Sequence, residues 1–199
     1  MNFRLSFWFR KRRKKRCVAG HGNKLENIPK KAKVLIFGNN NMISFEKPVE
    51  GFHGTIQIGA PDSPTNNARI MIGKHIQANG VVILLLEDGS EIIIGDDCLI
   101  SADVAIWGSD SHAIFSQNEG SLLNKGRNIH IGNHVWIGLR ATILKNVILP
   151  DNCIVGAGAI VSSSIHPESG DIIAGNPACV VKKGVSWSKA RPNDFFLTK

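Results

Sequence analysis

The sequence predicts an all-β fold in which short parallel strands stack coil upon coil, and three observations predict it. An aliphatic residue returns every six positions, at Ile131, Ile137, Ile143, Leu149, Val155 and Val161. Small or medium apolar residues stand four positions after the first five of these, at Val135, Ala141, Val147, Cys153 and Ala159. The same register is present upstream at Ile94, Ile100 and Ile106, and a polar segment separates the two regions.

The period of six is the observation that decides between folds. Six residues turn an α-helix by about 600°, so the aliphatic side chains would spiral around it instead of forming a stripe. A β-sandwich is disfavoured too, because its strands alternate with period two and its turns vary in length. A short flat strand followed by a corner fits. Three such units close a triangular coil of about 18 residues, and coils stack at about 4.8 Å.

The limits of the coil domain follow from where the repeat can be traced. The repeat weakens near Ile56, Ile72 and Ile76. We therefore expect the domain to span residues 33–181, with irregular early coils and loops at 60–68 and 86–91. Residues 182–199 are predicted to form a C-terminal cap that covers the last coil or packs on a neighbour. This cap contains Trp187, Arg191, Phe195, Phe196 and Leu197.

Residues 1–32 are predicted to be a tail that carries most of the net charge of +8. The run Arg10–Arg16 supplies seven positive charges, so the remaining chain is close to neutral and no nucleic-acid partner is expected. This run could instead contact an anionic membrane surface or an anionic glycan, or remain a solvated tail. The aromatic residues that precede it are Phe3, Phe7, Trp8 and Phe9.

The expected location is the cytoplasm, with a possible contact at the inner face of its membrane. The four cysteines form no C-x-x-C pair and fit free thiols in a reducing compartment. No stretch reaches the roughly 18 apolar residues that a membrane span needs. The apolar residues at the N-terminus come before the basic run, unlike those of a signal peptide.

The segment 107–130 interrupts the repeat and carries the candidate catalytic group. Long polar loops in compact domains are usually functional, and this one places Asp110 and His112 near its start. A neutral imidazole can take the proton of a hydroxyl that attacks a thioester, which typically contributes about 10²–10⁴ in rate. The carboxylate two residues earlier could orient the ring. The alternative interpretation is a histidine on an ordinary surface loop.

Two motifs, GSDSHAIF from residue 108 and IGNHVWIG from residue 131, resemble the O-acetyltransferases of the hexapeptide-repeat family. The resemblance covers about residues 70–190 and extends to members that O-acetylate capsular polysaccharides such as polysialic acid. It implies a left-handed parallel β-helix, a homotrimer with a site in each groove between subunits, acetyl-CoA as co-substrate, a carbohydrate acceptor and no metal. It also implies that His112 is the general base and that Trp136 shapes the acceptor and thioester site.

Further positions carry over through this resemblance. The backbone N–H of Gly138 would stabilise the oxyanion, and Gly156 and Ala157 would let the pantetheine arm lie against the backbone. Positions that match the rest of the coenzyme A path are Ser162, Asn176, Pro177, Lys182 and Lys183. On the acceptor side the resemblance implies Asn79 and Asp103. Glycine, alanine and asparagine at these positions could equally serve tight corners of the coil.

Three other functions remain open at this point. N-acetylation of an amino sugar or a xenobiotic would use the same loop histidine. A zinc-dependent hydratase would need three histidine ligands, and His112, His130 and His134 invite that comparison. The spacing of four between His130 and His134 disfavours it, because the two point differently on a strand of period six. A non-catalytic scaffold would need neither His112 nor Trp136.

Overall fold

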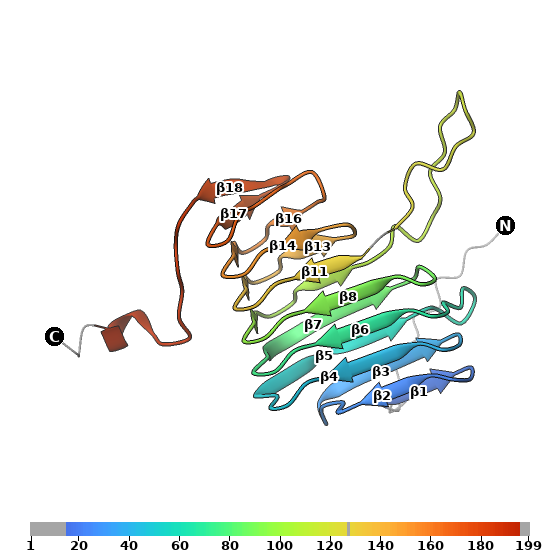
Figure 1. Ribbon diagram of the computed structural model, residues 1–199, viewed down its shortest axis with the longest axis horizontal. Coiled ribbons are helices and arrows are strands. Elements are labelled where there is room, and N and C mark those ends of the chain that lie inside the picture. Colours follow the sequence, from blue (N-terminus) through green and yellow to red (C-terminus); the bar gives the residue numbers. More distant parts are fainter. Residues whose placement is uncertain (1–14, 127, 196–199) are drawn as a thin grey trace, which may run out of the picture.

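The computed structural model describes residues 15–126 and 128–195. It contains a parallel β-helix, a stack of coils from which one long loop and a C-terminal segment depart (Figure 1). Residues expected in the tail and the cap that lie outside the described residues are Phe3, Phe7, Trp8, Phe9, Arg10–Lys14, Phe196 and Leu197. Among the described residues, no helix has the length and apolar character that crossing a membrane requires.

One face of the stack is a parallel sheet. Its strands in spatial order are β2 (Lys24–Glu26), β4 (Met42–Phe45), β6 (Arg69–Ile72), β8 (Glu91–Ile94), β11 (Ile129–Ile131) and β14 (Ile148–Leu149). Equivalent residues lie beside one another, as Ile94 does with Ile131 and Ile131 with Leu149. The six-residue repeat of the sequence therefore becomes a column of aliphatic side chains inside the stack.

The second sheet divides into two faces as the chain advances. In the first coils it has strands β1 (Arg16–Ala19), β3 (Ala32–Phe37), β5 (Gly51–Ile58) and β7 (Gln77–Leu85). The start of β7 pairs with β9 (Leu99–Ile100), and its end pairs with β10 (Ala105–Trp107). The first face continues with β12 (Trp136–Ile137), β15 (Ile154–Val155) and β17 (Ile172–Gly175), and the other face continues with β13 (Thr142–Leu144) and β16 (Ile160–Val161).

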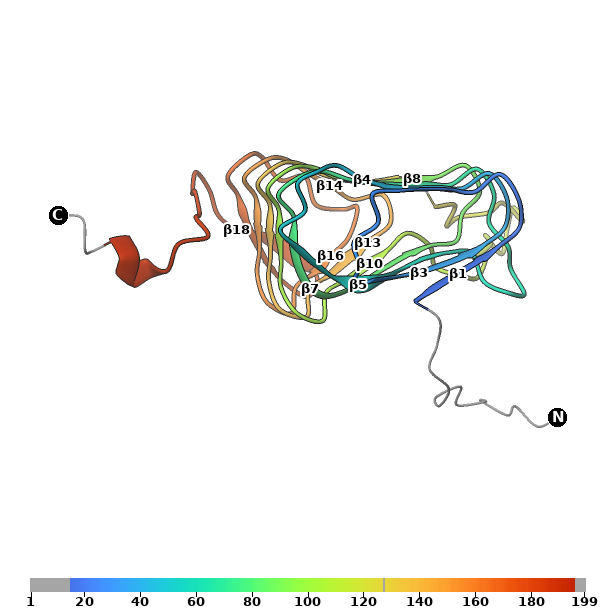
Figure 2. The ribbon, with the colours of Figure 1, turned by 90° about the horizontal axis from the view of Figure 1, so that it is seen from below.

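The unbroken strands explain why the repeat is weak upstream. Later coils turn between the two faces at Asp103, Arg140 and Gly158, whose φ angles are 56°, 56° and 70°. Strands β5 and β7 continue past the same place as unbroken strands, and the corner is reduced there to a shift of register after His53 and a φ of 92° at Gly80. Figure 2 shows the result as an elongated outline for the first coils and a shorter one for the later coils.

The core confirms the inward positions predicted from the hexads. The six aliphatic residues from Ile131 to Val161 are buried, and so are the residues four positions later, such as Cys153 and Ala159. Full burial of one aliphatic side chain stabilises a protein by about 1.5–3 kcal/mol. The outward position of Trp136 is also confirmed, since 38% of this residue is exposed.

A second column stands at the corner before β9, β12 and β15. Residues with left-handed backbone conformation repeat there at His75, Asp97, His134 and Asn152, with φ of 56°, 57°, 52° and 63°. Backbone hydrogen bonds join this corner from one coil to the next, for example from His134 N to Asp96 O at 2.7 Å. We call these four residues the corner column.

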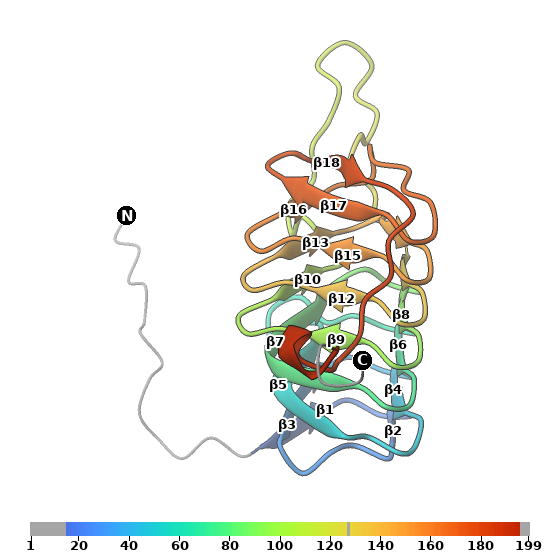
Figure 3. The ribbon, with the colours of Figure 1, turned by 90° about the vertical axis from the view of Figure 1, so that its left-hand side faces the viewer.

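Both ends of the stack differ from expectation. Strands β1 and β2 place the first coil at Arg16, within the segment expected to be a tail, because β1 pairs with β3 and β2 with β4. Strand β18 (Ala178–Lys182) folds back antiparallel on β17. Residues 183–191, which we call the C-terminal strap, then descend along the side of the stack to the short helix η1 (Pro192–Phe195) (Figure 3). The strap is bonded to the last coil at its start, where Val185 N donates to Gly170 O at 2.9 Å, and its later residues Trp187 and Lys189 contact earlier coils.

Candidate active site

His112 is exposed near the base of the loop between β10 and β11. The loop forms an arm that projects from the stack (Figure 1), and an antiparallel bridge between Phe115 and Leu122 holds its two sides together. His112 lines a small hollow of about 220 Å³ together with Glu87, Ser109 and other loop residues. The structure thus presents the histidine at the surface, where a substrate can reach it.

A network of polar side chains fixes the base of this loop. Lys145 Nζ lies 2.5 Å from Asp110 Oδ2. The side chain of Asn124 donates to Asp110 Oδ2 at 2.9 Å and to the backbone oxygen of His112 at 2.8 Å. The hydrogen bond from Lys145, and then the one from Asn124, holds the pKa of Asp110 below its usual value. Asp110 was expected to orient the imidazole, but its hydrogen bonds in the described structure go to Lys145 and Asn124. It therefore positions the backbone at His112.

Trp136 lies on a different side of the stack from the loop. Strand β12, which begins at Trp136, belongs to the side from which Figure 3 is viewed, whereas the loop leaves the opposite side (Figures 1 and 3). The indole Nε1 donates to Ser101 Oγ at 3.4 Å, and its ring centroid is 6.0 Å from that of Trp187. A single chain therefore does not bring His112 and Trp136 together.

Small residues stand at the ends of strands β12, β15 and β17 on the face that carries Trp136. Gly138, Gly156 and Ala174 follow one another in adjacent coils, and a Cβ atom on Gly138 would come within 2.7 Å of Ala157 N. The N–H of Gly138 donates to Val155 O at 2.7 Å. That N–H therefore already has an acceptor in the ladder between coils, and its expected oxyanion role stays a prediction.

The other residues expected along coenzyme A are spread over two faces and the last hairpin. Ser162 follows β16 on the face opposite the corner column, and its hydroxyl is 2.8 Å from that of Ser164. Asn176 and Pro177 form the turn between β17 and β18. Lys182 is exposed beside Ile172, whereas Lys183 forms an exposed ion pair with Glu168 at 3.2 Å.

On the acceptor side the two expected residues lie near each other, because a Cβ atom on Gly80, the residue after Asn79, would come within 3.6 Å of Asp103 N. Asn79 lines a hollow of about 290 Å³ over β5, β7 and β9, which we call the acceptor hollow. Its other lining residues are Glu50, Gly51, His53, Gln77, Ala78, Leu99 and Ile100. Asp103 is absent from this lining and lies 3.9 Å from Arg140 at an exposed corner.

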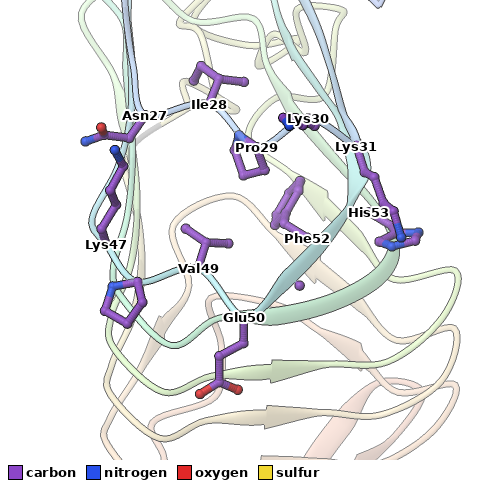
Figure 4. A pocket seen from close by; sticks show the side chains of 12 residues that line it. Asn27, Ile28, Pro29, Lys30, Lys31, Lys47, Val49, Glu50, Phe52 and His53 are labelled. Atoms are coloured by element: carbon purple, nitrogen blue, oxygen red, sulfur yellow. The ribbon is translucent and has the colours of Figure 1, made fainter.

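A larger hollow of about 630 Å³ adjoins the acceptor hollow at the first coils. We call it the basal hollow (Figure 4). Lys30, Lys31 and Lys47 are among its lining residues. It shares Glu50, Gly51 and His53 with the acceptor hollow, so the two form one continuous surface. No repeat or motif in the sequence singles out this surface.

The histidines compared with a zinc site have other partners. His130 Nε2 is 3.6 Å from Glu91 Oε1. His134 Nδ1 is 2.6 Å from Asp97 Oδ2, and its Nε2 is 3.1 Å from Trp187 O. Within residues 15–126 and 128–195, no three His, Cys, Asp or Glu side chains gather as a metal site would require.

Sequence reasoning missed Lys145, Asn124 and Glu50, and it placed Trp187 in a cap. Lys145 occupies an outward hexad position, which predicts an exposed side chain. In the structure only 13% of that side chain is exposed, because it contacts Asp110 at the base of the loop. Trp187 contacts His134, which lies 53 residues earlier in the chain. Such a contact leaves no local pattern in the sequence.

Comparison with known proteins finds the same six-residue repeat and similar acetyltransferases. The family profile described as the hexapeptide repeat of succinyl-transferase matches residues 128–163. A polysialic acid O-acetyltransferase of Escherichia coli O1:K1 / APEC is 29% identical over 125 residues, 63% of this chain and 40% of that protein. One from Neisseria meningitidis is 28% identical over 132 residues, 56% of this chain and 59% of that protein.

The likeness extends to solved structures. A polySia-specific acetyltransferase aligns with a TM-score of 0.59 and 26% identity, and the alignment covers 88% of this chain and 90% of that chain. The chain spans less than two thirds of the length of the two curated relatives. The hexads folded into stacked coils, the matched hexapeptide repeat and the likeness to these acetyltransferases identify the fold as the left-handed β-helix of hexapeptide-repeat proteins.

Proposed function

We propose that the protein transfers an acetyl group from acetyl-CoA to a hydroxyl of a sugar in a capsular or other surface polysaccharide. The observation that carries this proposal is the column above exposed Trp136. Outward neighbours rise from Trp136 through Ile154 and Ile172 to Lys182. Three strand spacings of about 4.8 Å separate the ends by roughly 14 Å. That span suits an extended pantetheine arm with its phosphates at the lysine end, and the two curated relatives support the acceptor class.

The site forms between two copies of the chain in this proposal. His112 and Trp136 lie on different sides of one chain, so the histidine of one subunit would serve the tryptophan of the next. The loop tip supports this arrangement, because its large apolar side chains are 47–63% exposed. They are Ile114, Phe115, Leu122 and Leu123. Contiguous exposed apolar surface usually marks an interface, and a cyclic trimer would bury three equivalent arms.

The reaction then needs one proton carrier. The imidazole of His112 takes the proton of the sugar hydroxyl while that oxygen attacks the thioester carbonyl. The carbon–sulfur bond breaks, and the imidazolium returns the proton to the thiolate of coenzyme A. Lys145, Asp110 and Asn124 hold the backbone at His112 in place before the substrate binds. The reaction then does not have to bear the entropy cost of positioning the base.

The test is thiol release from acetyl-CoA with acidic glycans, neutral sugars, amino sugars and chloramphenicol as acceptors. The wild type should release thiol with a glycan, and His112→Ala should lower the rate by about 10²–10⁴. His21→Ala is the matched control, since His21 is exposed in the first coil, remote from Trp136. Light scattering should give three times the 21.7 kDa of the chain. Full activity of His112→Ala, or release with amines alone, would contradict the proposal.

A further inference from the structure

The C-terminal strap is bound to the corner column at two points. At the first, the ring of Trp187 stacks on that of His134, with centroids 4.1 Å apart and planes 11° from parallel. Trp187 Nε1 donates to His134 O at 2.8 Å, and His134 Nε2 lies 3.1 Å from Trp187 O. This reciprocal contact sets the height at which the strap crosses the coils.

At the second point Lys189 reaches two carboxylates. Its Nζ lies 2.6 Å from Asp97 Oδ1 and 3.3 Å from Glu50 Oε2, and it donates to His75 O at 3.1 Å. Its side chain is 25% exposed. A bond from Gln77 and those from Lys189 and His75 outweigh burial and lower the pKa of Glu50. One ammonium group thus faces two ionised carboxylates.

This second point touches the surface that an acceptor would use. Glu50 lines both the acceptor hollow and the basal hollow. Figure 4 shows Lys30, Lys31 and Lys47 around the basal hollow and Glu50 at its lower edge, with the carboxylate directed away from the lysines. Glu50 therefore lies at the border of the two hollows, and the other charged side chains that line them are those of the three lysines.

We infer that the strap belongs to the acceptor site and that Lys189 determines whether an acidic acceptor can use it. The inference rests on the proposed function and deepens it. Lys189 neutralises Glu50 and Asp97, so that a negatively charged glycan can lie over the two hollows beside the surface lysines. Without Lys189 the same surface would present the Glu50 carboxylate with no lysine partner, and nearby Asp97 would lose its lysine partner as well. Lys189 is then a positioning residue that acts through Glu50.

The sign of the effect separates this role from a structural one. When the positive charge of Lys189 is lost, the remaining carboxylates should repel acidic acceptors and leave neutral acceptors unaffected. General damage to the fold would lower kcat/KM for both kinds of acceptor. The difference should shrink at high salt, because exposed charges are screened. Replacing Glu50 by glutamine should remove most of the repulsion that loss of Lys189 creates.

The experiment compares kcat/KM for oligosialic acid and for a neutral oligosaccharide such as maltose. Lys189→Met should lower the ratio of acidic to neutral acceptor by roughly tenfold at low salt. Lys189→Arg should keep the wild-type ratio, and Lys189→Met with Glu50→Gln should restore it. Lys74→Met is the matched control. It also removes one positive charge, and it breaks a single exposed ion pair, that between Lys74 and Asp96 at 3.4 Å.

Each result bears on the inference. An unchanged ratio in Lys189→Met, or an equal fall in Lys74→Met, would overturn it while the proposed function stands. A wild type that transfers acetyl to neither acceptor would overturn both. If Lys189→Met fails to fold, Glu50→Gln alone decides, since the inference requires it to raise the ratio of acidic to neutral acceptor.

Discussion

Lys145 Nζ lies 2.5 Å from Asp110 Oδ2, and this contact joins the loop that carries His112 to the coil after it. Only 13% of the Lys145 side chain is exposed, so water screens the pair less than it screens a surface ion pair. Lys145 also donates to the backbone oxygen of Asn124, on the returning side of the loop. One lysine therefore holds both sides of the loop base.

Lys145→Met should misplace His112 and lower kcat/KM by about 10–100-fold, because small displacements of a catalytic group are costly. Steady-state kinetics on protein that circular dichroism finds folded would measure it. Lys74→Met, which breaks only an exposed ion pair, should stay close to the wild type. Wild-type kinetics in Lys145→Met would mean that the contact with Asp110 does not position the base.

The same contact predicts a response to acid. The pKa of Asp110 is lowered, first by Lys145 and then by Asn124. A carboxyl with a lowered folded pKa stabilises the protein above its unfolded pKa, and this stabilisation is lost as the pH falls through the folded value. The loop base should therefore stay closed from neutral pH down through the ordinary pKa range of an aspartate, and open only at lower pH.

Hydrogen exchange of residues 108–126, corrected for the intrinsic rate, would follow this opening. Asp110→Asn is the control, because an amide has no such titration and its variant should show no step in acid. An acid step of equal size in Asp110→Asn would assign the change to other carboxylates.

The four free cysteines should divide into two reactive and two unreactive thiols. Burial raises the pKa of Cys98 to about 12, and it also raises the pKa of Cys153. Cys17 and Cys179 are exposed. Maleimide at about pH 8 should therefore add two groups to the native protein and four in denaturant, as read by intact mass. Native labelling of Cys98 would show that the coils open around it.

A core hexad position and an outward position should respond differently to truncation. Ile137 is fully buried, so Ile137→Ala should lower the free energy of unfolding by about 2–5 kcal/mol. Ile148 is 65% exposed, and Ile148→Ala should change it by at most about 0.5 kcal/mol. Urea unfolding of the two variants measures both. Equal losses would contradict the assignment of the hexad register.

The sequence predicts the later coils well because one local rule governs them. The residues at Ile137, Ile143 and Leu149 must point inward wherever a strand of this period turns at fixed corners. The first coils escape that rule, since β5 and β7 are long strands in which a shift of register replaces the full corner and breaks the six-residue spacing. The strap escapes it too, because Trp187 and Lys189 find their partners 53 to 139 residues away.

The candidate site, like the fold, could be predicted from the sequence only in part. His112 and Trp136 could be singled out by motif, but their separation within one chain could not be predicted from residue order. Residue order could not reveal either that the amide of Gly138 donates to Val155 O.

A mixing experiment tests most directly whether the site forms between subunits. His112→Ala and Trp136→Ala chains, each inactive alone, would be co-folded in equal amounts and assayed for thiol release with the acceptor of the wild type. A trimer in which His112 of one subunit serves Trp136 of the next should recover about one quarter of the wild-type sites. If both residues act within one chain, mixing would restore no activity, and the proposed site between subunits would be wrong.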